Sequence, residues 1–141
     1  GAGHHQLQDS SDSAQAVAFA VGLGAKRITL LGATAGRLDH TLANISLAAA
    51  CREDAGLHVL DDSCDLQVLS GLRRLDVPAG APLSIVPLTP DVRIRTEGLQ
   101  WELDEPLELG TRGLSNRALA EEITIDVTEG LVALIIFHSA G

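Results

Sequence analysis

One short apolar run constrains the fold of this chain more than any other feature: Arg27-Ile28-Thr29-Leu30-Leu31, closed by Gly32. The run predicts a strand buried on both faces, as in a parallel sheet. Such a strand requires further strands on both sides and helices on both faces. Residues 1–70 supply at most two helices and three strands. We therefore expect the first half to be the C-terminal part of an α/β domain whose beginning lies outside the 141 residues.

The sequence changes character near Gly71, and we expect two domains, 1–70 and 71–141. The first is predicted to be α/β, with helices over 12–21 and 38–51 and further strands over 57–60 and 66–69. The second is predicted to be all-β, a small sandwich of jelly-roll-like type. Its expected strands cover 83–88, 92–96, 99–103, 122–128 and 131–137, with a turn at Glu129-Gly130.

The acidic balance of the chain excludes several classes of function. Lys and Arg number 10 and Asp and Glu 19, which gives a net charge of −9. Nucleic acids and anionic membranes need a basic face, so we expect neither as the main partner. With 2 Phe, 1 Trp and no Tyr, the chain has no aromatic platform for stacked bases. No apolar run approaches the ~20 residues that span a bilayer. The start shows no signal-peptide pattern, so we expect a cytoplasmic location.

The segment 31–44 carries the most informative pattern, in which a buried strand ends, a glycine-bearing loop follows and a helix begins. Backbone N–H groups and the positive end of a helix would meet there and stabilise an anion. Arg37 adds a planar donor suited to phosphate. Three polar residues project from the first turns of the helix: Asp39, His40 and Asn44. The alternative is a structural turn shaped by Gly32 and Gly36, with Arg37 paired to a nearby acid.

A second candidate group is the acidic run Gln8-Asp9-Ser10-Ser11-Asp12 ahead of the first helix. Clustered carboxylates at such a place can hold a hydrated Mg²⁺ ion that bridges substrate phosphates. The alternative is that Asp12 simply caps the helix.

A third candidate group combines Trp101 with the pair Ser115-Asn116. The indole offers a flat face to a cationic or heteroaromatic ring. The hydroxyl and the amide offer donors and acceptors to a polar ring edge. The alternative is a core tryptophan and an ordinary Ser-Asn turn.

Taken together, the three groups resemble the thiamine pyrophosphokinase family. Its acidic stretch K/Q-D-x-T-D corresponds to residues 8–12, with Ser11 in place of the usual Thr. Its G-G-x-x-G-R-x-D-H-x-L-x-N motif corresponds to residues 32–44, with Ala33 at the second glycine. Its G-L-K/Q-W-x-L and S-N motifs correspond to residues 98–103 and 115–116. The order of the motifs also agrees, and the resemblance runs over nearly the whole chain.

This resemblance implies an activity and an assembly. The family transfers a pyrophosphoryl group from ATP to the hydroxyl of thiamine, with Mg²⁺, and forms thiamine diphosphate and AMP. Residues 1–70 would be the C-terminal part of the doubly wound catalytic domain, which binds ATP and Mg²⁺, and 71–141 the thiamine-binding domain. The resemblance further implies a homodimer whose sites are shared between the α/β part of one subunit and the β part of the other.

The resemblance also assigns roles to residues. The catalytic residues would be Asp12, Arg37 and Asp39, and Asp12 would also bind the metal. The residues that bind ATP phosphates would be Gln8, Asp9, Gly36 and Arg37. The residues that bind thiamine would be His40, Asn44, Trp101, Ser115 and Asn116.

Two further family segments, D-G-G-A and G-D-x-D-S, have no match in residues 1–141. They hold additional carboxylates for nucleotide and metal, so we expect catalysis to need residues outside this chain. One alternative is a thiamine- or nucleotide-binding module of the same fold without catalysis. Another is a related diphosphokinase that acts on a pterin alcohol, against which the β part with Trp101 argues.

Overall fold

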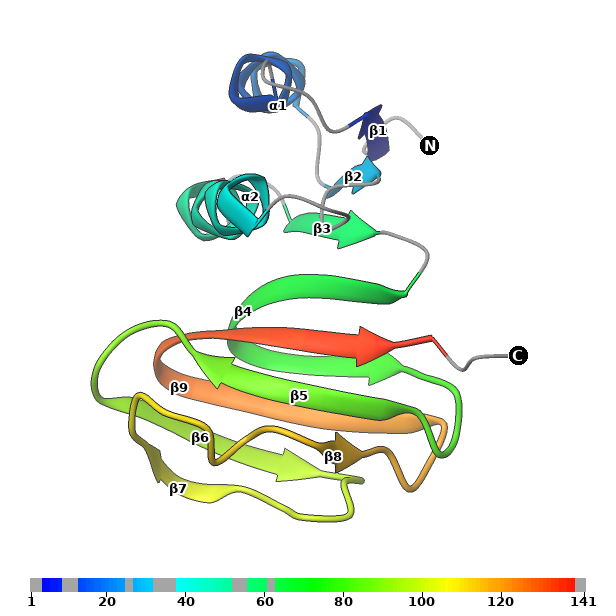
Figure 1. The fold of residues 1–141 in the computed structure, drawn as a ribbon, viewed down its shortest axis with the longest axis vertical. Coiled ribbons are helices and arrows are strands. Elements are labelled where there is room, and N and C mark those ends of the chain that lie inside the picture. The colour runs from blue at the N-terminus through cyan, green and yellow to red at the C-terminus, as the bar shows by residue number, and fades with distance from the viewer. Residues whose placement is uncertain are drawn as a thin grey trace. The chain divides into compact units, whose positions relative to one another are not determined.

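The computed structural model describes residues 4–8, 13–24, 27–31, 38–51, 56–60 and 63–138. Over these residues the chain is mostly β-sheet with two helices (Figure 1). The chain divides into two compact units, Gly1–Val68 and Leu69–Gly141. Within the described residues, both helices belong to the first unit and the second is built from strands.

The central strand of the first unit is β2 (Arg27–Leu31). It pairs in parallel with β1 (His4–Gln8) on one side and with β3 (Gly56–Leu60) on the other. Ile28 and Thr29 are consecutive and therefore point to opposite faces of the sheet. Their exposed fractions are 0% and 7%. The predicted parallel strand, buried on both faces, is confirmed.

β1 is a strand that the sequence patterns did not predict. Its residues, His-His-Gln-Leu-Gln, include one apolar side chain and show no strand periodicity. The backbone of β1 is aligned along β2, with His5 opposite Ile28 and Leu7 opposite Leu30. The strand therefore follows from pairing with a buried neighbour rather than from its own sequence.

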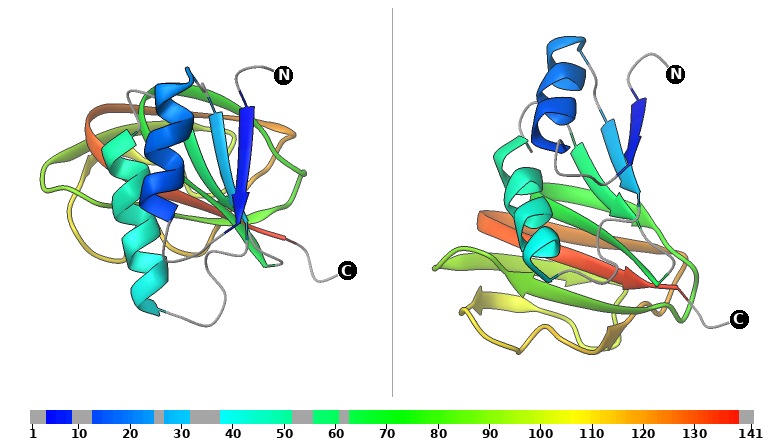
Figure 2. Two further views of the ribbon diagram at one scale, coloured as in Figure 1. Left: turned by 90° about the horizontal axis from the view of Figure 1, so that it is seen from above. Right: turned by 45° about the horizontal axis from the view of Figure 1, so that its top comes forward.

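The helices α1 (Ser13–Gly22) and α2 (Leu38–Cys51) lie on the same face of the parallel strands (Figure 2). α1 lies against β1, and α2 lies against β3. After α1, the N–H of Gly24 donates to the carbonyl of Val21 at 2.9 Å, and Gly24 has a φ of +85°. A glycine in this left-handed conformation is a common helix C-terminus. Both predicted helices are confirmed.

The second unit is an antiparallel arrangement of strands. β4 (Cys64–Asp76) begins beside β3 and continues into this unit. The strands that follow are β5 (Pro82–Pro87), β6 (Val92–Glu97), β7 (Asp104–Leu107), β8 (Asn116–Arg117) and β9 (Glu122–Phe137). β9 pairs with both β5 and β6, while β7 pairs with β6 and β8 pairs with β5.

Apolar side chains of these strands form the core of the second unit. In β6, Val92, Ile94 and Thr96 are buried while the residues between them are exposed, and the strand predicted over 92–96 is confirmed. Fully buried side chains from β5 and β9 include Leu83, Ile85, Ile123, Ile125 and Leu134. Burial of each such side chain contributes roughly 1.5–3 kcal/mol. This core holds β6 in place and thereby anchors the turn that follows it.

The turn predicted at Glu129-Gly130 is wrong, because β9 passes through these residues as one continuous strand. Residues 124–129 of β9 pair with β6, and residues 132–136 pair with β5. Gly130 has a φ of +85°, and a Cβ atom there would lie 2.6 Å from the hydroxyl oxygen of Thr89. The glycine therefore marks an irregularity at which β9 leaves one partner and joins another.

Candidate functional site

The carboxyl ends of β1 and β2 meet at one edge of the sheet, because Gln8 is paired with Leu31. The candidate segments 8–12 and 32–44 leave from these two neighbouring strand ends. Open α/β sheets bind their ligands at this edge. The register therefore brings the starts of two separate sequence motifs together. Four of the predicted residues in these segments lie outside the described part of the chain: Asp9, Asp12, Gly36 and Arg37.

The remaining candidates of the first unit lie on α2. Asp39 is exposed in the first turn, where a negative charge interacts favourably with the helix dipole. Its Oδ1 atom accepts a hydrogen bond from the N–H of His40 at 2.9 Å. His40 is half-buried, whereas Asn44 is buried within the unit. Asp39 and His40 are thus the members of this predicted set that a ligand can reach.

Trp101 lies in a turn, and the strand predicted over 99–103 is wrong. Residues 98–103 link β6 to β7, and Leu99 makes an isolated bridge to Ala118. Gly98 has a φ of +95°, and a Cβ atom there would lie 3.1 Å from the carbonyl oxygen of Glu122. Trp101 is 57% exposed, so the alternative of a core tryptophan is also wrong.

Asn116 holds the peptide groups on both sides of Trp101. The N–H of Trp101 donates to the Oδ1 atom of Asn116 at 3.1 Å, and the Nδ2 atom of Asn116 donates to the carbonyl of Trp101 at 2.7 Å. The same Oδ1 atom accepts the N–H of Arg117 at 2.8 Å. Asn116 is 5% exposed. Two residues of the third candidate group are therefore in direct contact, and the amide of Asn116 positions the backbone that carries the indole.

Ser115 precedes β8 in a left-handed conformation, with a φ of +60°. Its N–H donates to the hydroxyl oxygen of the buried Ser84 at 3.1 Å. Gly113 lies so close to β5 that a Cβ atom there would be 2.2 Å from the carbonyl oxygen of Ile85. The segment that carries the Ser-Asn pair is therefore fixed against β5, and Ser115 itself remains exposed.

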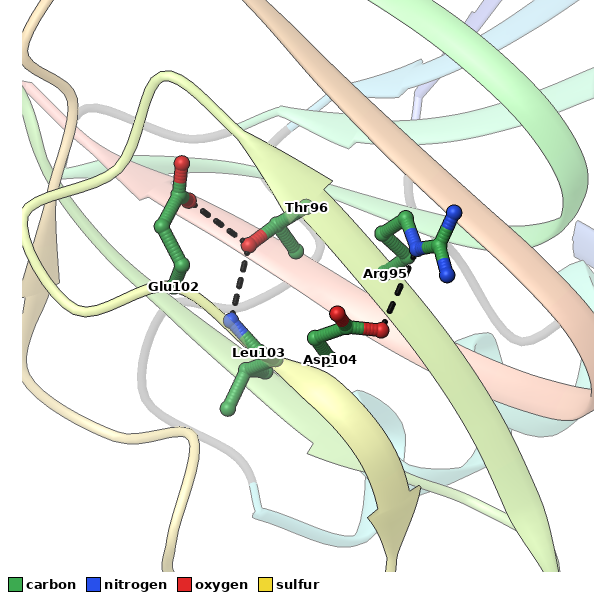
Figure 3. Close-up of polar contacts among 5 residues, drawn as sticks. All are labelled: Arg95, Thr96, Glu102, Leu103 and Asp104. Carbon is green, nitrogen blue, oxygen red and sulfur yellow. Dashed lines mark hydrogen bonds and ion pairs between the residues drawn. The ribbon is translucent and has the colours of Figure 1, made fainter.

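The sequence interpretation missed Glu102, the residue that follows Trp101. Its carboxylate accepts a hydrogen bond from Thr96, in the strand before the turn (Figure 3). It accepts two more from backbone N–H groups of the turn itself. A single glutamate beside a motif position matches no pattern of a site. The one available signal was Gly98, since a glycine at the end of a strand indicates a turn that polar side chains must support.

Two surface hollows in the second unit are lined by other residues. The larger, about 600 Å³, is lined by Glu105, Pro106, Glu108, Leu109, Gly110, Thr111 and Arg112. The smaller, about 420 Å³, is lined by Arg93, Ile94, Arg95, Asp104, Glu105, Pro106, Asp126 and Thr128. Trp101, Ser115 and Asn116 line neither of these hollows.

Within the described residues, no three His, Cys, Asp or Glu side chains are grouped so that they could hold a metal ion. Asp12, the predicted metal ligand, lies outside those residues. None of the helices in the described part of the chain has the length and apolar character needed to cross a membrane.

Two family models match the chain, one in each unit. Residues 3–59 match "Thiamin pyrophosphokinase, catalytic domain", and residues 74–132 match "Thiamin pyrophosphokinase, vitamin B1 binding domain". A curated relative is thiamine pyrophosphokinase 1 of Arabidopsis thaliana, which is 29% identical over 124 residues. That alignment covers 82% of this chain and 46% of the Arabidopsis protein, so the chain spans about half the length of its relative.

Solved structures share the fold. The thiamine pyrophosphokinase of Bacillus subtilis superposes with a TM-score of 0.84 at 21% identity, over 93% of this chain and 64% of that one. The thiamin pyrophosphokinase of Geobacillus thermodenitrificans gives a TM-score of 0.80 at 26% identity, over 94% and 64%. Because both family models match in chain order and the fold agrees with these structures, the chain belongs to the thiamin pyrophosphokinase family.

Proposed function

We propose that this protein transfers the pyrophosphoryl group of ATP to the hydroxyl of thiamine. The hydroxyl oxygen bonds to the β-phosphorus of ATP and loses its proton. The bond from that phosphorus to the oxygen of the α-phosphate breaks, so AMP and thiamine diphosphate are formed. The observation that carries the proposal is the order of the two matches, a catalytic domain over 3–59 followed by a vitamin B1 binding domain over 74–132.

In this proposal the first unit is the C-terminal part of a doubly wound α/β domain that binds ATP. The residues that bind phosphate are Gln8, Asp9, Gly36 and Arg37, and those that act in catalysis are Asp12, Arg37 and Asp39. The common edge formed by the ends of β1 and β2 supports this assignment, as does the exposed position of Asp39 at the start of α2. Such a transfer depends on positioning and charge neutralisation, without a covalent nucleophile.

Mg²⁺ is part of the proposal as the partner of the ATP phosphates, whose charge it neutralises when bound. The described residues do not form a site for it. The proposed ligand, Asp12, follows Asp9 by three residues in the sequence and lies outside the described part of the chain. We therefore assign Mg²⁺ no contact with the described side chains.

The second unit is proposed to be a sandwich that binds thiamine. The exposed face of Trp101 would stack against the cationic thiazolium ring, a contact worth about 0.5–2 kcal/mol. Ser115 would hydrogen-bond the ligand, while Asn116 hydrogen-bonds the backbone of Trp101 and keeps the turn in place. His40 of the first unit would complete the proposed thiamine set, whereas Asn44, which is 4% exposed, is assigned no direct contact with the ligand.

We further propose a cytoplasmic homodimer in which each site is shared between subunits. Trp101 and Leu119 are exposed apolar residues of the second unit, at 57% and 63%. Such side chains gain free energy when a partner surface covers them. Sedimentation of the protein at micromolar concentration should give twice the mass of one chain.

The proposal is tested by product analysis with the longest form of the protein that its gene encodes. Equal amounts of AMP and thiamine diphosphate should form, and both should require thiamine and Mg²⁺. Formation of ADP in place of AMP would contradict the proposed chemistry, because it reports transfer of a single phosphoryl group. A matched reaction without thiamine measures background hydrolysis of ATP.

Fluorescence separates the enzyme from a binding module of the same fold. Trp101 is the one tryptophan of the chain, so its emission reports a single place. Thiamine should quench this emission whether or not turnover follows. Quenching without AMP formation would favour the binding module, and an unchanged spectrum would contradict the role of Trp101.

A further inference from the structure

The carboxylate of Glu102 accepts three hydrogen bonds from the turn that carries Trp101 and from the strand before it. Its Oε1 atom accepts a hydrogen bond from the hydroxyl of Thr96 at 2.8 Å and another from the N–H of Leu99 at 3.1 Å. Its Oε2 atom accepts the N–H of Gly98 at 3.0 Å. Glu102 therefore joins the end of β6 to the arm of the turn that precedes Trp101.

Thr96 extends this connection to the arm that follows Trp101. Its hydroxyl oxygen accepts the N–H of Leu103 at 2.9 Å while the hydroxyl proton is donated to Glu102 (Figure 3). The N–H of Thr96 also donates to the carbonyl of Leu103 at 2.8 Å. Thr96 is buried, so little water competes for these bonds. Hydrogen bonds to an ionised acceptor are stronger than those between neutral groups.

Glu102 thus fixes the backbone before an exposed tryptophan, Asn116 fixes it at that residue, and Thr96 fixes it afterwards. Asn116 binds the peptide groups of Trp101 itself, and Glu102 binds Gly98 and Leu99 directly. An aromatic face that is already fixed loses less conformational entropy when a ligand stacks on it. The same three bonds occupy the carboxylate of Glu102.

We infer that Glu102 is a positioning residue for thiamine recognition: it fixes the turn on which Trp101 meets the cationic ring. It takes no part in the transfer of the pyrophosphoryl group. The inference rests on the proposed function, because it requires that Trp101 binds thiamine. It gives a role to the residue at the unspecified position x of the G-L-K/Q-W-x-L motif.

The test compares Glu102→Ala and Glu102→Gln with the matched control Glu97→Ala. Glu97 is an exposed residue of β6, so its replacement removes the same charge from the same unit. Glu102→Ala should raise the KM for thiamine about tenfold, since it removes three bonds to a charged acceptor, and should leave kcat and the KM for ATP within about twofold. The KM for thiamine of Glu102→Gln should fall between those of the wild type and Glu102→Ala. The amide of glutamine retains one oxygen acceptor but turns an N–H toward Gly98.

A second readout follows Trp101 in the ligand-free protein. The fluorescence anisotropy of Trp101 should decay faster in Glu102→Ala than in the wild type or in Glu97→Ala. A thermal melt establishes that each variant is folded. If Glu102→Ala does not fold, Glu102→Gln is compared with Glu97→Ala instead. An unchanged KM or an unchanged anisotropy decay in the folded Glu102 variants overturns the inference.

The wild-type protein separates this failure from that of the proposed function. If the wild type forms no AMP with thiamine, the proposed function fails before any variant is measured, and the inference falls with it. If the wild type turns over and the Glu102 variants match Glu97→Ala, the inference alone is overturned.

Discussion

Replacement of Asn116 by alanine tests how far one buried amide supports the Trp101 turn. The change removes three hydrogen bonds, to the N–H and carbonyl of Trp101 and to the N–H of Arg117. A neutral hydrogen bond contributes a net ~1 kcal/mol. The bond to Arg117 joins adjacent residues and adds less, and the exposed turn lets water replace part of the others. We expect Asn116→Ala to lower the free energy of unfolding by about 1.5–2 kcal/mol.

The measurement is urea unfolding followed by far-ultraviolet circular dichroism, because the substitution also changes the fluorescence of Trp101. Ser115→Ala is the matched control, because it keeps the hydrogen bond from the N–H of residue 115 to Ser84. The free energy of unfolding of this variant should stay within about 0.5 kcal/mol of wild type. A loss in Asn116→Ala no larger than in Ser115→Ala would refute the proposed support. Asn116→Asp separates bonding from packing. Aspartate keeps the shape of the side chain but replaces Nδ2, which lies 2.7 Å from the carbonyl oxygen of Trp101, with an oxygen atom that cannot donate. Asn116→Asp should therefore lower the free energy of unfolding at least as much as Asn116→Ala.

Two further predictions concern the second unit. Gly130→Ala should lower the free energy of unfolding by at least ~2 kcal/mol, because left-handed backbone costs a residue with a Cβ about 1–2 kcal/mol and the new atom would lie 2.6 Å from the Thr89 hydroxyl oxygen. Urea unfolding should show a smaller loss for Gly130→Ala in a Thr89→Ala background, and equal losses would argue against the contact. Arg95→Ala should change stability by less than about 0.5 kcal/mol, since its ion pair with Asp104 is exposed. A thermal melt that shows a larger loss would mean that this pair is coupled to the core.

Local patterns predicted much of the first unit. The apolar run at 27–31 and the helical pattern at 38–51 coincide with β2 and α2 as the structure has them. These elements carry their signal in their own residues: a short, mostly apolar run in one case and a helical spacing of apolar residues in the other. β1 has no such signal, because its sequence shows no strand periodicity. Its backbone is stabilised instead by pairing with β2.

In the second unit the local patterns failed at Glu129-Gly130 and at residues 99–103. Glu129-Gly130 has the composition of a turn, yet β9 continues through it because the two halves of the strand pair with β6 and β5. Residues 99–103 alternate like a strand, yet they form a turn because Glu102 and Thr96 bind their backbone groups. The first outcome depends on pairing with strands that are distant in the sequence. The second depends on side-chain hydrogen bonds between nearby residues, which an alternating pattern does not reveal.

For the candidate site, the residue types could be read from the chain alone: an acidic run, a glycine-bearing loop with Arg37, one tryptophan and a Ser-Asn pair. Only the tertiary structure shows that Asn116 hydrogen-bonds the backbone of Trp101 and that Glu102 hydrogen-bonds the same turn. Residue types follow from the chain, but a hydrogen bond requires two atoms within about 3 Å. Residues 101 and 116 meet at that distance because antiparallel pairing of β8 with β5 and of β6 with β7 and β9 brings their segments together.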